Sequence, residues 1–83
     1  MEDKTLCEIA CMISRDWKKP YFGAVPYLEA MLTLVSIEDK YLYDSGKSIV
    51  LYFLANAQTW KGEVAREVKK ELNRRAKECV ACL

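Results

Sequence analysis

The spacing of the apolar residues constrains this chain most, because it fits helices along most of the length and a strand nowhere. Between Thr5 and Trp17, apolar side chains recur every three or four positions, which is the period of one helix face. No segment alternates apolar and polar residues between the turn residues that a hairpin needs. The 83 residues suffice for one modest core. We therefore predict a single helical domain over residues 1–83, all-α, folded as a compact bundle of four to five helices.

Capping residues and apolar stripes place the expected helices along the chain. Thr5 and Glu8 have the T-x-x-E spacing of a capping box, and Pro26 suits the first turn of a helix. Ser36 can begin a short helix by the same capping logic, and Thr59 can cap the last and longest one. The five predicted helices cover residues 5–17, a segment from Pro26 to about Val35, a short segment from Ser36, residues 45–57, and residues 60–81. Among the residues expected to face inward are Leu28, Met31, Leu32, Val35, Ile49, Tyr52, Phe53, Ala57, Val68 and Leu72.

Four cysteines stand in two pairs, one near each end of the chain. The pairs are Cys7-x3-Cys11 and Cys79-x2-Cys82, and on helices these separations place both members of a pair on one face. If the first and last helices are neighbours, the four thiolates can form the tetrahedron that zinc prefers. Such a closed site would be structural and would join the N- and C-terminal helices. Free thiols and, in an oxidising compartment, disulfides are the alternatives.

The composition argues against an enzyme. The chain has no histidine, which excludes Ser-His-Asp and Cys-His catalysis and any histidine-ligated metal. Its carboxylates are scattered, and the P-loop-like Gly46-Lys47-Ser48 has Tyr41 where the first glycine would stand. The acidic start does not resemble a secretory signal, and the longest apolar run, Ile49 to Ala55, is too short to span a membrane. We expect a soluble intracellular binding protein with no catalytic residue and no membrane partner.

Two groups of residues are candidates for contact with a partner. Tyr21 and Phe22 follow Lys18 and Lys19 in a loop flanked by proline and glycine, which can present both rings to solvent. The last predicted helix is rich in lysine and arginine, although the whole chain has a net charge of only +1. Such mixed helices are most often simply solvated, and the alternative is a surface for phosphate or for an acidic protein patch. The predicted contact residues are Lys18, Lys19, Tyr21, Phe22, Arg66, Lys69, Lys70 and Arg74.

The cysteine set of this short helical chain resembles that of small, zinc-containing, phage-encoded anti-CRISPR proteins, which inhibit type II effector nucleases. The stretch from residues 21–28 (YFGAVPYL) through 60–63 (WKGE) is also similar to small proteins of phages and mobile elements of Gram-positive bacteria. The resemblance implies a stoichiometric inhibitor in the bacterial host cytoplasm. Such a protein binds the RNA-guided nuclease and blocks target DNA loading or cleavage.

One property of the chain departs from part of that family. Inhibitors that mimic DNA are strongly acidic, whereas this chain is nearly neutral. We therefore expect this chain to bind the nuclease at a surface other than the one that DNA-mimicking inhibitors occupy. The alternatives are a small nucleic-acid-binding regulator, with its last helix on phosphates, and a sponge for cyclic nucleotides; direct nucleic-acid binding is the less favoured partner class.

Overall fold

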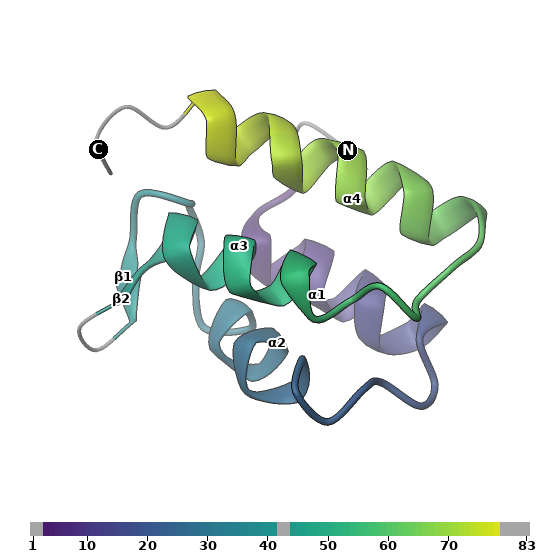
Figure 1. Ribbon diagram of the computed structural model, residues 1–83. Helices are drawn as coiled ribbons and strands as arrows, with labels where there is room; N and C mark the ends of the chain where they lie inside the picture. The colour runs from purple at the N-terminus through teal and green to yellow at the C-terminus, as the bar shows by residue number, and fades with distance from the viewer. Residues whose placement is uncertain (1–2, 42–43, 79–83) are drawn as a thin grey trace.

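Four helices and one very short strand pair make up the part of the chain that the computed structural model describes, residues 3–41 and 44–78 (Figure 1). The predicted all-α bundle is confirmed, with four helices in the described residues. In chain order the elements are α1 (Leu6–Asp16), α2 (Val25–Met31), β1 (Lys40–Tyr41), β2 (Asp44–Ser45), α3 (Gly46–Ala55) and α4 (Glu63–Glu78).

The first helix begins and ends at locally encoded caps. The Glu8 N–H donates to Thr5 Oγ1 at 3.1 Å, and the Thr5 N–H donates to Glu8 Oε1 at 2.8 Å. This is the predicted capping box, in which each residue satisfies the other's free amide. At the other end, the Trp17 N–H donates to the Ile13 carbonyl at 2.8 Å. The prediction of a helix over residues 5–17 is confirmed to within its two cap residues.

The second helix starts as predicted but ends early. Pro26 lies in its first turn, and Leu28 and Met31 are buried. The helix stops at Met31, so the residues beyond it no longer follow a helical period. Consequently Leu32 and Val35, which were expected to face inward, are exposed, and Leu34 is buried instead.

The predicted short helix at Ser36 is wrong. The Asp39 carboxylate accepts hydrogen bonds from the amides of Val35 at 3.1 Å and Ser36 at 3.0 Å. These bonds satisfy the local amides in a turn, so the backbone has no need of a helix there. The chain continues into β1 and β2, which pair antiparallel with Lys40 opposite Ser45 and Tyr41 opposite Asp44.

The third helix supplies much of the core. It is capped by Ser45, whose Oγ accepts from the Ser48 N–H at 3.1 Å, and Phe53 is fully buried. Gly46 at its start packs on the preceding turn so closely that a Cβ would lie 2.6 Å from the Ile37 carbonyl oxygen. Ile49 and Phe53 are buried as predicted, whereas Tyr52, also predicted to face inward, is half exposed.

The last helix begins later than predicted. Gly62, with a φ of 118°, bends the backbone, and α4 starts at the next residue rather than after a Thr59 cap. Trp60 is thereby withdrawn into the core, where it stacks on Trp17 with ring centroids 5.7 Å apart. Among the expected inward residues of α4, Val68 and Leu72 are buried.

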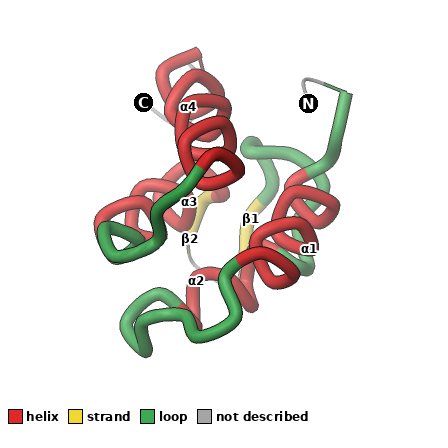
Figure 2. The backbone as a smooth tube through the Cα atoms, turned by 90° about the vertical axis from the view of Figure 1, so that its right-hand side faces the viewer, coloured by secondary structure: helices red, strands yellow, loops and turns green. Residues whose placement is uncertain are grey.

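The helices surround this shared core (Figure 2). In Figure 1, α1 and α3 run in one direction and α4 returns in the other. The Trp60 Nε1–H donates to Asp16 Oδ2 at 2.8 Å, which ties the approach to α4 to the end of α1. Helix α1 packs against both α2 and α4, and α3 does the same. No helix in the described ranges has the length and hydrophobicity that a membrane span requires.

Candidate partner-binding surface

The loop between α1 and α2 presents two aromatic rings to solvent. Phe22 is 79% exposed and Tyr21 is 44% exposed, and their ring centroids are 4.7 Å apart. Lys18 and Lys19 precede them and are exposed as well. We call Tyr21, Phe22 and the pocket beside them the aromatic corner.

The backbone of the aromatic corner is held in place. The Ala24 N–H donates to the Tyr21 carbonyl at 2.9 Å, and Ala24 itself is buried. Gly23 permits the close approach of the loop to α3, because a Cβ there would lie 2.6 Å from the Tyr21 ring and 2.8 Å from Asn56 Oδ1. The exposed rings are therefore carried by a hydrogen-bonded turn that packs against the core through Ala24.

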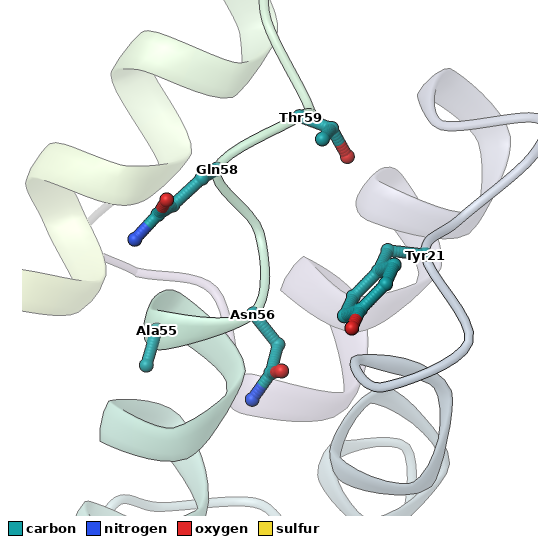
Figure 3. Close-up of a pocket in the computed structure, with 5 residues that line it drawn as sticks. All are labelled: Tyr21, Ala55, Asn56, Gln58 and Thr59. Carbon is teal, nitrogen blue, oxygen red and sulfur yellow. The ribbon is translucent and has the colours of Figure 1, made fainter.

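A pocket of about 260 Å³ adjoins Tyr21 (Figure 3). Tyr21 comes from the α1–α2 loop, and the other lining residues come from the end of α3 and the connection that follows it: Ala55, Asn56, Gln58 and Thr59. The Asn56 side chain lies near Tyr21, and its Nδ2 donates to the Tyr52 carbonyl at 2.9 Å. The volume is below the range of about 300–1,000 Å³ typical of small-molecule sites, so the pocket suits a single side chain of a partner.

More exposed apolar surface lies along α3. Tyr52 packs on Tyr27 of α2 with ring centroids 5.4 Å apart, and the neighbouring Leu51 is also exposed. Asn56 connects this region to the aromatic corner through its contact with the Tyr52 backbone. The contribution of α3 was not predicted from the sequence, since Tyr52 was expected in the core and Asn56 belongs to no motif.

The predicted contact residues on α4 have different environments. Arg74 donates to Glu71 Oε2 at 2.6 Å and to Glu78 Oε2 at 2.6 Å, so its charge is already paired within the helix. Arg75 also donates to Glu71 Oε2, through its Nε–H at 2.6 Å. Hydrogen bonds from Arg74, and then from Arg75, lower the pKa of Glu71 to about 2.

Nearer the start of α4, the cations form no ion pair with any residue that the structure describes. Arg66 and Lys70 are exposed. Lys69 is half-buried, and its Nζ donates to the Trp60 carbonyl at 2.6 Å and lies 5.9 Å from the centre of the Trp60 ring. Desolvation, and after it the charge of Lys61, lowers the pKa of Lys69. The predicted α4 residues thus divide into an ion-paired end and a cationic end.

Two of the four predicted zinc ligands lie in the described residues. Cys7 is half-buried and Cys11 is exposed; both are free thiols on α1, one helical turn apart. Helix α1 does neighbour α4, as the predicted site requires. Cys79 and Cys82 lie outside the described residues. Among residues 3–41 and 44–78, no group of three or more metal-ligating side chains comes together.

Comparison with protein-family models, with curated proteins and with solved structures found no match to this chain.

Proposed function

We propose that this protein is a binding protein without enzymatic activity that inhibits a type II CRISPR effector nuclease stoichiometrically. The observation that carries the proposal is the exposed pair of Tyr21 and Phe22 beside a side-chain-sized pocket. The choice of nuclease as the partner rests on the resemblance of the cysteine set and of residues 21–28 and 60–63 to phage-encoded inhibitors.

Exposed aromatic rings of this kind favour protein recognition. Aromatic residues dominate the binding energy of many interfaces, because each buries a large area and has few rotamers to lose. The turn that carries Phe22 is already fixed by hydrogen bonds and by buried Ala24, so binding would order little backbone. Lys18 and Lys19 add positive charge at the rim, which favours an acidic patch on the partner.

These features suit inhibition by binding, in which the protein occupies a surface of the nuclease that the reaction needs. The chain is close to neutral, so its charge does not imitate a DNA duplex. Docking of the aromatic corner on the nuclease would instead block DNA loading or the conformational change that precedes cleavage, which are separable steps. No residue of this chain needs to undergo chemistry in either case.

We also propose a structural zinc held by Cys7, Cys11, Cys79 and Cys82. The two cysteines of α1 fit half of such a set, because they are free thiols spaced by one helical turn. The metal would fasten α1 to the chain beyond Glu78 and add its binding energy to that of folding. Metal analysis of the purified protein should find stoichiometric zinc, and a chelator should lower the temperature of unfolding. Absence of zinc, with four thiols that react freely in the native state, would contradict the site.

The inhibition is tested by titrating guide-loaded type II nucleases with the protein and measuring cleavage of target DNA. We expect inhibition that saturates near equimolar protein, and addition of the DNA before or after the protein then identifies the blocked step. Phe22→Ser should weaken inhibition by more than tenfold, as expected for a central aromatic anchor. Val35→Ser is the matched control, because Val35 is also exposed, at 62%, but its carbonyl contacts the first residue of α1, at the opposite end of that helix.

Two results would contradict the proposal. One is full cleavage by every nuclease tested at excess protein. The other is equal inhibition by wild type and Phe22→Ser, which would remove the aromatic corner from the interface.

A further inference from the structure

A second pocket, separate from the aromatic corner, lies at the start of α4. It has a volume of about 260 Å³, and we call it the basic pocket. Its lining residues are Trp60, Lys61, Gly62, Ala65, Arg66 and Lys69. Three of these six carry a positive charge and none carries a negative one. The proposed inhibitor function makes no use of this cavity.

The cations converge because of the local backbone. Arg66 and Lys69 are three residues apart on α4 and therefore share one helix face. Lys61 joins them from the preceding loop, where Gly62, at a φ of 118°, turns the chain into the helix. The space beside the Gly62 backbone is open, since no heavy atom lies within 4 Å of the position that a Cβ would take.

Trp60 forms the floor of the basic pocket and is anchored in the core. Trp60 is buried, stacks on Trp17 and donates its indole N–H to Asp16 at 2.8 Å. Its carbonyl accepts from Lys69 Nζ at 2.6 Å, which holds that ammonium group at the pocket. An ammonium group has further N–H donors, and these remain for a ligand.

The described part of the chain provides no counter-charge in contact with the three cations. Over residues 3–41 and 44–78, no ion pair joins Lys61, Arg66 or Lys69 to a carboxylate. The contrast is with the other end of α4, where Glu71 pairs with both Arg74 and Arg75. Like-charge repulsion from Lys61 contributes to the lowered pKa of Lys69. An anion between these groups would relieve the repulsion.

We propose that the basic pocket binds the phosphate group of a small phosphomonoester. One arginine and two lysines line the cavity, and their guanidinium and ammonium groups match the charge and the several acceptor oxygens of a phosphate. The cavity is below the usual size of a site that encloses a whole drug-sized ligand. It therefore fits the phosphate, with the rest of the ligand lying outside.

Inorganic phosphate is the first probe, titrated into the full chain at constant ionic strength. The backbone amides of Gly62 and Arg66 and the Trp60 indole N–H should shift and saturate together in NMR spectra. Arg66→Gln should weaken this binding by about tenfold, the effect of losing one charge-assisted contact. Lys70→Gln is the matched control: it removes one positive charge from the same helix, one residue from the pocket, and should change the affinity less than twofold.

Two further probes separate the possible sources of the phosphate. A nucleoside 5′-monophosphate should bind at least as tightly as inorganic phosphate and lose the same factor in Arg66→Gln. An oligonucleotide without terminal phosphates should bind no more tightly than phosphate does. Lys61→Gln repeats the test at a loop position, so the result does not depend on one variant.

The proposal is overturned by any of three results. The first is the absence of a saturable shift with phosphate. The second is an equal loss of affinity in Arg66→Gln and Lys70→Gln, which would indicate diffuse screening of a charged face. The third is tighter binding of the oligonucleotide, which would identify a nucleic-acid backbone as the ligand.

Discussion

Glu71 offers the sharpest test of how α4 is held together. Its carboxylate is largely buried and accepts hydrogen bonds from Arg74 at 3.1 and 2.6 Å and from Arg75 at 2.6 Å. Glu71→Gln keeps the size of the side chain and removes its charge. We expect the variant to fold but to be less stable at neutral pH, because Arg74 and Arg75 lose the charge of the carboxylate that both contact.

The lowered pKa of Glu71 bounds the size of the effect. Each pH unit by which folding lowers a pKa corresponds to about 1.4 kcal/mol of stability. The change from 4.5 to about 2 therefore gives an upper bound of about 3.5 kcal/mol. Solvent screens the interaction, since the Arg74 side chain is 42% exposed, and exposed pairs contribute about 0.2–1 kcal/mol each. We expect Glu71→Gln to cost about 1–2 kcal/mol at pH 7.

The sign of the pH dependence follows from the direction of the shift. Folding lowers the pKa of Glu71, so its stabilisation is fully present above pH 4.5 and is lost as the pH falls towards about 2. Urea unfolding of both proteins, followed by circular dichroism, should show the full difference at pH 7. The difference should shrink steadily as the pH is lowered from about 4.5.

Glu78→Gln is the control, because the Glu78 side chain is 60% exposed and, within the described residues, forms an ion pair with Arg74 and with no second arginine. It should change the free energy of unfolding by less than about 0.5 kcal/mol. A difference for Glu71→Gln that is the same at acidic and neutral pH would refute the electrostatic explanation and assign the effect to packing.

Three shorter predictions concern other positions. Gly46→Ala should lower the free energy of unfolding by about 1–3 kcal/mol, because the added Cβ would meet the Ile37 carbonyl oxygen at 2.6 Å; urea unfolding measures it, and an unchanged midpoint would contradict the close packing. Thr5→Ala should cost about 1 kcal/mol, because Oγ1 no longer accepts from the Glu8 N–H, while the backbone N–H of residue 5 can still donate to the Glu8 carboxylate. Cys11 is exposed, so after treatment of the protein with a chelator its thiol should react rapidly with iodoacetamide. Added zinc should slow this reaction if the proposed zinc site is correct. Equal rates with and without zinc would count against that site.

The accuracy of the sequence predictions depends on how local the determining interactions are. Helix α1 was predicted almost to the residue, because its two caps involve side chains and amides within four positions of each other. The start of α4 was predicted too early, because Thr59 looks like a cap in isolation. What decides that segment is the stacking of Trp60 on Trp17, a contact between distant parts of the chain.

The candidate sites also have features that local sequence determines and features that depend on contacts between distant segments. Exposure of Phe22 could be expected from its flanking proline and glycine, which are local signals. The pocket beside Tyr21 could not, since it forms only where the end of α3 meets the α1–α2 loop. Likewise, the sequence marks α4 as basic throughout but does not show that Arg74 is paired while Arg66 lines a cavity.

Trp60 determines which variants can test these proposals. Its ring belongs to the core, its indole N–H binds Asp16, and its carbonyl holds Lys69. It also immediately follows Thr59, the last residue that lines the pocket of the aromatic corner. A substitution at Trp60 would therefore disturb the fold and both proposed sites at once, and a loss of function there would identify neither. Exposed residues such as Phe22 and Arg66 can be changed without disturbing the core, so only variants of that kind separate nuclease inhibition from phosphate binding.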